Sequence, residues 1–534
     1  WYLTERKRLP CSLFITMYLL KYCKWIWIIL ALWVVGGLLL FYNPKTQYNN
    51  EIVLAAPRDI APGPKDPYYI SSIGMVWEPL IGVDANGQIA GVLASGWKGQ
   101  NDNKDWVISL RQNVTFHDGS PFNADAVLKN VERWQNMKTK PSPFYTFNYK
   151  ALYPGLTQIE KIDDYTVVFH LDKPDPVFPE RLINFSSAMF NPNSYEMTTG
   201  DFINTDIGTG PFKIVDRQTN QYVVLQRNDQ YYGEKAKSQF IRIRTIPSAE
   251  TRYAALKAEE IYGVVDIGAM TPALSLELLG DSRFAMSKNR NTLNQVLTVN
   301  ESRWPFSDSR MVKALSLAVD RDILLQQYFS GQAQPNINIL NSLNPFSIDL
   351  PITYDMEKAK ELSAEVLQGK RVQAKLLIPQ YGLNRYSYKE VAQYLQYLYK
   401  ELGIDISIVI LDGSAFSKLS SQGNYDLSLG TMGLANYAPE TIFNTYLADK
   451  GRMNTLYKVG YHDDEASMLL KKLDGLSTIE ERIPVYDRLQ VIGIEHPPTI
   501  ILGSDLNALI YNQAKIKGYN ALTYGVSLQT IEWR

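Results

Sequence analysis

The chain has 534 residues, a mass of 60.7 kDa and a net charge of −1, with 54 Lys and Arg against 55 Asp and Glu. The length is too great for one ordinary domain, and a hydrophobic fraction of 45% is that of a globular protein rather than a disordered one. The balanced charge argues against binding to nucleic acid through phosphate neutralisation. Because both cysteines, Cys11 and Cys23, lie near the start, the remainder contains no disulfide and no thiolate metal site.

An uncharged apolar run, WIWIILALWVVGGLLLF, occupies residues 25–41 and follows Lys21 and Lys24. At about 1.5 Å per residue it spans roughly 25 Å, the short end of what crosses a bilayer. The basic flank predicts a cytoplasmic N-terminus and an exported remainder. A cleaved signal peptide is the alternative, but no small-residue cleavage site follows closely, so a membrane anchor at 25–42 is favoured. Residues 1–24 form a basic tail, in which Met17 is a sensible start.

Beyond a polar linker, short strand-like runs alternate with helical stretches. The pattern predicts strands at 105–110, 165–171, 221–225 and 240–244, and helices at 124–136, 249–259 and 309–329. A β-α-β unit follows at 372–379, 388–402 and 404–411, with Gly403 at the expected end of the helix. Such a unit indicates an α/β fold with parallel strands. Two β-rich stretches, 294–300 and 499–504, bracket this segment and predict a lobe inserted between two crossing strands.

A series of motifs occurs in a fixed order. The series is VWEPLI at 76–81, LASGW at 93–97, LRQNVTFHDG at 110–119, PFNADAV at 121–127, GTGPF at 208–212, YYG at 231–233 and NYDL at 424–427. In this order the chain resembles the extracytoplasmic solute-binding proteins of family 5, which deliver oligopeptides, dipeptides or nickel chelates to ABC importers. The resemblance covers roughly residues 50–534.

The resemblance implies a two-lobed periplasmic-binding-protein fold of type II, the large cluster C form, with an extra subdomain in the first lobe. We expect lobe I at 50–293, lobe II at 294–498 and a return to lobe I at 499–534. The chain would act as a monomer with an ABC permease and its ATPases, hold no cofactor, and perform no catalysis.

The resemblance also suggests where solute binds. Peptide binders of the family hold the ligand's amino group with an Asp before a Pro-containing loop, where this chain has Asn436, and a neutral amide cannot form that charge-assisted bond. Glu440 is a substitute candidate, although a carboxylate in the first turn of a helix is the simpler interpretation.

Tyr437, and Lys138 or Lys140, match positions that hold a small metal chelate in the nickel-binding members, and Arg111 is a further candidate. The histidine that those members carry downstream has no counterpart at 449–454, so no direct metal ligand is predicted. A nickel chelate is therefore the preferred solute, with a di- or oligopeptide as the alternative. An exported hydrolase or a sensory receptor on the same fold are the alternatives of another class. The hydrolase is disfavoured because neither G-x-S-x-G nor H-E-x-x-H occurs.

Overall fold

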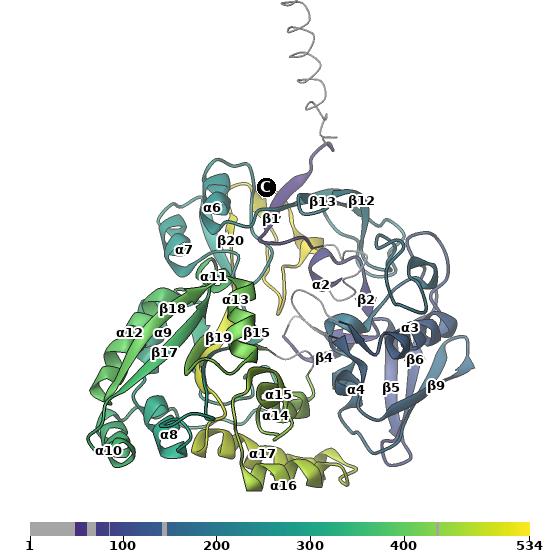
Figure 1. The fold of residues 1–534 in the computed structure, drawn as a ribbon. Helices are drawn as coiled ribbons and strands as arrows, with labels where there is room; N and C mark the ends of the chain where they lie inside the picture. Colours follow the sequence, from purple (N-terminus) through teal and green to yellow (C-terminus); the bar gives the residue numbers. More distant parts are fainter. Residues whose placement is uncertain (1–47, 61–70, 85, 141–146, 434–436) are drawn as a thin grey trace, which may run out of the picture. The chain divides into compact units, whose positions relative to one another are not determined.

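The computed structural model describes residues 48–60, 71–84, 86–140, 147–433 and 437–534 (Figure 1). The predicted membrane anchor at 25–42 and the candidate residue Asn436 lie outside these ranges. Within them, no helix combines the length and apolar composition that crossing a bilayer requires. The buried apolar side chains of the described residues form four hydrophobic cores.

The first core surrounds a four-stranded sheet with the order β1-β14-β13-β12, in which only β1 and β14 are parallel. Alternate side chains such as Val223 and Leu225 of β13, or Ile241 and Ile243 of β14, are buried here, as the two-residue period of a strand requires. The C-terminal residues Leu528 and Ile531 pack into the same core. Its elements are β1 (Ile52–Ala56), α2 (Ser71–Gly74), β12 (Phe212–Gln218), β13 (Tyr222–Arg227), β14 (Phe240–Thr245), α6 (Ala249–Lys257), α7 (Pro272–Leu279), β21 (Ile516–Lys517), η3 (Leu528–Thr530) and β22 (Glu532–Trp533).

The second core lies between an antiparallel sheet of order β5-β6-β10-β9 and helix α3. The helix begins after Asn123, whose side chain accepts a hydrogen bond from the amide of Ala126, and it buries Val127, Val131 and Trp134. The elements of this part are β2 (Glu78–Pro79), β3 (Ile81–Val83), β4 (Ile89–Gly91), β5 (Ala94–Gln100), β6 (Asp105–Leu110), α3 (Ala124–Met137), β7 (Thr139–Lys140), β8 (Phe147–Asn148), α4 (Tyr149–Leu152), β9 (Leu156–Asp163), β10 (Thr166–Leu171), α5 (Phe178–Arg181), η1 (Phe185–Ser187), β11 (Ala188–Met189) and η2 (Pro192–Ser194).

The third and fourth cores belong to a six-stranded mixed sheet, β16-β20-β15-β19-β17-β18, and to the helices packed around it. The elements are β16 (Ala333–Gln334), β17 (Val372–Pro379), β18 (Ile404–Leu411), β19 (Leu427–Gly433), α8 (Ser309–Leu317), α9 (Arg321–Tyr328), α10 (Met356–Leu367), α11 (Gln380–Leu383), α12 (Tyr388–Glu401), α13 (Gly413–Ser421), α14 (Pro439–Tyr446), α15 (Arg452–Tyr457), α16 (Asp464–Leu473) and α17 (Ile479–Glu495). We call the parts that carry the first two cores lobe I, and those that carry the last two lobe II.

Two long neighbouring strands, β15 (Phe284–Val299) and β20 (Ile500–Asn512), pass from one lobe to the other in antiparallel pairing. At one end Phe284 and Ile510 pack in the first core, and at the other Leu297 and Ile500 pack in the third. These strands therefore connect the lobes and are the place where a change in lobe orientation would be absorbed.

Most predicted elements are confirmed, including the β-α-β unit, in which β17 and β18 are parallel neighbours and Gly403 has a φ of 80°. The prediction of one helix over 309–329 is wrong, because two helices, α8 and α9, occupy this stretch. The break has a local cause: the side chain of Asp320 caps α9 by accepting a hydrogen bond from the amide of Ile323.

Candidate functional site

Polar side chains are buried where the two crossing strands pass between the lobes. The pairing of β15 with β20 shifts register between Arg290 and Asn294, and the described side chains on both strands at this point are largely amides and hydroxyls. The buried members are Asn291, Thr292, Asn294, Gln295, Ser504, Asp505 and Asn507. Burying polar groups in the centre of a strand pair costs free energy unless each has a hydrogen-bond partner. Groups without a partner in the protein are therefore the ones that a ligand could bond.

Asp505 is the one carboxyl among these side chains, and it is 3% exposed. Its Oδ2 accepts a hydrogen bond from the Tyr386 hydroxyl at 3.1 Å. The ring of Tyr388 stacks on that of Tyr386, and the Tyr388 hydroxyl donates to Gln295 Oε1 at 2.8 Å. Burial raises the pKa of Asp505 to about 7, which the bond from Tyr386 and the nearby amides of Gln295 and Asn291 only partly offset. Both tyrosines come from lobe II, so side chains of lobe II hold Asp505 of the crossing strand β20 in place.

Several buried polar atoms near the crossing strands have no hydrogen-bond partner among the described residues. Among these atoms are Asn291 Nδ2, Gln295 Nε2 and the hydroxyl of Tyr437. The two amides lie close enough to lower the pKa of Asp505, but their N–H groups are not in hydrogen-bonding geometry. Because an unpaired buried donor costs about 1–3 kcal/mol, such groups commonly await a water or a polar ligand.

Arg385, between α11 and α12, brings a cation of lobe II against lobe I. Gly268 has a φ of 63°, and a Cβ atom there would lie 3.0 Å from Arg385 Cβ, so glycine favours this close approach. Its Nη2 is 3.9 Å from Asp266 Oδ2, which already accepts a hydrogen bond from Arg58 Nε at 2.7 Å. Burial raises the pKa of Asp266, but Arg58 and Arg385 lower it by more. The net pKa is below the ordinary value, so the carboxylate is ionised. At 3.9 Å, Arg385 is held electrostatically and keeps hydrogen-bonding capacity for an anion.

Tyr437, a sequence candidate, lies at the interface of the lobes. Its backbone N–H donates to the carbonyl of Glu180 in lobe I at 3.2 Å, and its own carbonyl accepts from Asn344 Nδ2 at 3.0 Å. Burial raises the pKa of its hydroxyl to about 12, while Thr523 and Arg290 lower it and Asp84 raises it. These neighbours place the Tyr437 hydroxyl among groups from lobe I and the crossing strand β15.

Glu440, the second candidate in this loop, is occupied by protein side chains. Its two carboxylate oxygens accept hydrogen bonds from Arg181 of lobe I and from Arg482 and Tyr486 of lobe II. The carboxylate is in the first turn of α14, as the simpler interpretation anticipated, but it is buried and its partners are side chains. No carboxylate oxygen is left for the ammonium of a solute in this arrangement.

The three basic candidates do not come together. Lys140 forms an ion pair with Asp201 and donates to the carbonyl of Thr199 at 2.8 Å, all within lobe I. Lys138 is exposed at the end of α3, with a φ of 51°. Arg111 donates from Nε to the carbonyl of Val92 at 2.5 Å and lies over the ring of Tyr232. Of the three, Lys138 makes no side-chain hydrogen bond or ion pair among the described residues, and the role of each in binding stays a prediction.

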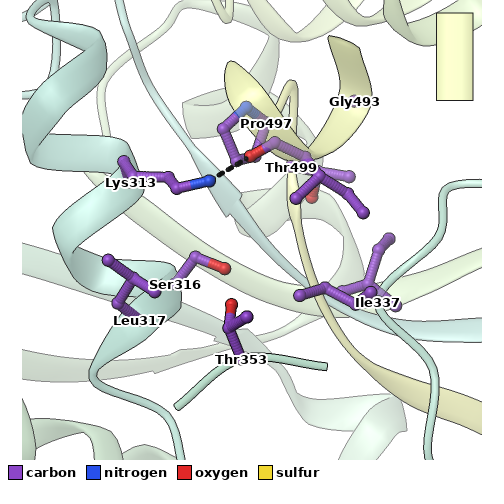
Figure 2. Close-up of a pocket in the computed structure, with 10 residues that line it drawn as sticks. Lys313, Ser316, Leu317, Ile337, Thr353, Gly493, Pro497 and Thr499 are labelled. Carbon is purple, nitrogen blue, oxygen red and sulfur yellow. Dashed lines mark hydrogen bonds between the residues drawn. The ribbon is translucent and has the colours of Figure 1, made fainter. Parts of the chain in front are cut away.

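One small cavity in lobe II does not have room for a solute (Figure 2). It holds about 10 Å³ beside Lys313, Ser316 and Thr353, and Lys313 Nζ donates to the carbonyl of Ile494 at 3.0 Å. That volume suits about one water molecule. A larger open depression of about 570 Å³ beside α6 is lined by residues of lobe I alone, from Arg244 to Glu260. In the described part of the chain, no group of three His, Cys, Asp or Glu side chains is placed to hold a metal ion.

Comparison with known proteins identifies the class. The sequence profile of the bacterial extracellular solute-binding proteins, family 5, matches residues 88–454, and the chain belongs to this family. It is thus an extracytoplasmic solute-binding protein of the kind that serves ABC transporters.

Relatives within the family carry different names. The heme-binding protein A of Haemophilus influenzae is 25% identical over 81% of this chain and 82% of its own length. The nickel-binding periplasmic protein of Escherichia coli is 24% identical over 74% of this chain and 78% of its own length.

Solved structures show that the type II binding-protein fold is shared. NikA from Brucella suis in complex with Fe(III)-EDTA superposes with a TM-score of 0.78 at 20% identity, over 91% of this chain and 100% of its own. DppA from Helicobacter pylori in complex with the peptide STSA superposes with a TM-score of 0.72 at 22% identity, over 90% of this chain and 98% of its own.

Proposed function

We propose that the chain captures a small carboxylate-bearing solute between its lobes and delivers it to the permease of an ABC importer. The observation that carries this proposal is that Arg385, 3.9 Å from Asp266, directly precedes Tyr386, whose hydroxyl bonds Asp505 on one crossing strand, while the other crossing strand carries unpaired buried amide donors. A guanidinium with spare donors and neutral N–H and O–H groups suits a carboxylate, which accepts several hydrogen bonds at once.

A nickel chelate and a peptide-like molecule both fit this chemistry. The names of the relatives include nickel, heme, glutathione and dipeptide binding, and each of these solutes except the bare metal ion carries a carboxylate. The four histidines support delivery of a metal already wrapped in an organic shell. His170, His462 and His496 each hydrogen-bond a carboxylate, and His117 bonds the backbone at Gly208 and Gly210. We therefore keep the metal chelate as the first candidate and the peptide as the second.

Calorimetry on the purified full-length chain separates these candidates. The panel is Ni(II) with excess histidine, histidine alone, a mixed dipeptide pool, glutathione and heme. Saturable heat with Ni(II)–histidine, and none with histidine alone, would support the chelate, whereas heat from the peptide pool alone would assign a peptide. A panel with no saturable heat from any member would contradict the proposed solute class.

We also propose that residues 25–42 anchor the protein in the cytoplasmic membrane, with the remainder outside. This rests on the uncharged run at 25–41 and the basic residues that precede it. When the chain with residues 25–42 is expressed in a bacterial host, it should stay in the membrane fraction after carbonate washing. Protease added to spheroplasts should digest the part outside the membrane. Release by carbonate would contradict anchoring.

A further inference from the structure

A buried cluster of charges joins the two lobes through residues outside the crossing strands. Lobe I contributes Asp175 and Arg181, from the segment that ends in α5, and lobe II contributes Glu440 of α14, with Arg482 and Tyr486 of α17. The side chains of Asp175, Arg181 and Arg482 are 3–4% exposed and that of Glu440 is 9% exposed. We call these five residues the clasp.

Hydrogen bonds cross the interface in both directions. Arg181 Nε donates to Asp175 Oδ2 within lobe I at 2.5 Å, and its Nη2 donates to Glu440 Oε2 of lobe II at 2.6 Å. In the opposite direction, Arg482 Nη2 donates to the carbonyl of Pro174 at 2.9 Å. Separation of the lobes would have to break both of these contacts.

Each half of the clasp is electrically neutral on its own. Asp175 pairs with Arg181 in lobe I, and Glu440 pairs with Arg482 and accepts from the Tyr486 hydroxyl at 2.5 Å in lobe II. Although burial raises the pKa of Glu440, Arg181 and Arg482 lower it below its ordinary value, so the carboxylate of Glu440 is ionised. When the lobes part, neither half is left with an unpaired charge. The contact can therefore open and close without the free-energy cost of an unpaired buried charge.

Neighbouring contacts repeat this pattern at the rim. Lys173 Nζ lies 2.5 Å from Asp474 Oδ1, and Asn103 Nδ2 donates to the carbonyl of Ser477 at 2.7 Å. Glu180 is half-buried beside the clasp, and desolvation raises its pKa to about 7, which favours the uncharged acid below that pH. Its backbone carbonyl accepts the N–H of Tyr437, three residues before Glu440, so the clasp is continuous with the loop that carries a candidate solute contact.

We propose that the clasp is an interlobe lock, in which Glu440 and Arg181 are positioning residues that hold Tyr437 against lobe I in the closed form. Glu440 then affects solute binding without touching solute. The inference rests on the proposed function for its link to solute, but the lock itself is a property of the protein without ligand. Since the apparent affinity scales with the fraction of molecules in the binding-competent form, weakening the clasp also weakens binding.

Hydrogen exchange at the Tyr437 amide tests the lock directly, because this N–H is bonded across the interface. In the solute-free full-length chain, E440Q leaves two arginines facing one remaining carboxylate, Asp175, and should raise the exchange rate of this amide about 10-fold or more. The conservative variant R181K keeps the charge but loses the fork that bonds Asp175 and Glu440 together, so a smaller rise is expected. R181K also provides the test of the lock if E440Q does not fold.

The matched control is E51Q, which removes the carboxylate of a comparably buried pair within lobe I. Glu51 is bonded to Arg242 Nε at 3.0 Å, and the two side chains are 11% and 8% exposed. E51Q should leave exchange at Tyr437 within about 2-fold of the native rate, since it breaks no interlobe contact. Equal rates at Tyr437 in E440Q, R181K and E51Q would overturn the lock.

The same experiment separates the lock from the proposed function. If E440Q accelerates exchange but no member of the solute panel slows it in the native chain, the lock stands and the solute assignment fails. If a solute slows exchange at Tyr437 equally in the native chain and in E440Q, with equal affinity, the solute assignment stands and the lock is wrong.

Discussion

At the scale of single residues, Arg385 is the side chain whose removal most directly tests the proposed solute. R385M keeps most of the apolar length and removes the guanidinium, and a charge-assisted hydrogen bond is worth about 1.5–3 kcal/mol, or roughly 10- to 150-fold in affinity. We expect the dissociation constant of the identified solute to rise by about that factor in calorimetry. The control R371M removes an exposed arginine of lobe II that pairs with Asp405, and should leave the affinity unchanged.

Asp505 predicts a pH dependence of stability with a definite sign. Its ordinary pKa of 3.8 is raised to about 7 in the folded protein, so between these values the folded state keeps a proton that the unfolded state has lost. Stability from this group is therefore greatest below pH 3.8, falls by about 1.4 kcal/mol per pH unit up to pH 7, and is constant above. Urea unfolding of the native chain and D505N at pH 4.5, 5.5 and 6.5 isolates the term as their difference. A difference that does not change with pH would contradict the raised pKa.

The same scale shows what the sequence could and could not predict of the site. Tyr437 was found because its motif position is local, and the structure places it at the lobe interface. Glu440 and Lys140 were chosen as charged residues near the right positions, but their partners, Arg181 and Asp201, are distant in sequence and occupy them. Arg385 was missed because no local signal distinguishes it; its position against lobe I is shown only by the close approach of Gly268 across the interface.

At the scale of elements, α17 is the helix that presents Arg482 to the clasp, and its start is fixed by a capping box. Glu481 N–H donates to Thr478 Oγ1 at 3.3 Å, and Glu481 Oε2 accepts from the Thr478 amide at 3.1 Å. T478A should lower the free energy of unfolding by about 1 kcal/mol, measured by urea denaturation. T219A, in the exposed turn between β12 and β13, is the control and should change it by less than about 0.5 kcal/mol. Equal effects of the two variants would contradict the capping role.

Elements with a strong period were predictable, and their ends were less so. The strands at 105–110 and 372–379 and the helix at 388–402 follow directly from their apolar spacing. The stretch 309–329 keeps a helical period across a break, so period alone could not separate α8 from α9, although Asp320 carried the signal of a new N-cap. The strand at 294–300 begins ten residues earlier, at Phe284, because pairing with β20 extends it through polar residues that no apolar pattern marks.

At the scale of the whole molecule, the buried clasp predicts that lobe closure depends little on salt. The net charge is −1, so no large field opposes the approach of the lobes, and the pairs of the clasp are shielded from counterions. Exchange at the Tyr437 amide should change by less than about 2-fold between 0.05 and 0.5 M NaCl. A large acceleration would show instead that exposed pairs such as Lys173–Asp474 hold the lobes, and K173M, which removes only that pair, would then reproduce it.

A solute bound between the lobes must stabilise both of them, because its contacts come from each and the crossing strands belong to both cores. At 100 times its dissociation constant, a ligand that binds only the folded state adds about 2.7 kcal/mol to the free energy of unfolding. We expect the free energy of opening, measured by amide hydrogen exchange, to rise by a similar amount at β13 in the first core and at β17 in the third. Neither lobe can unfold while the solute is bound to both. Protection confined to β13 would place the solute on lobe I alone, for example in the depression beside α6, and would contradict binding between the lobes.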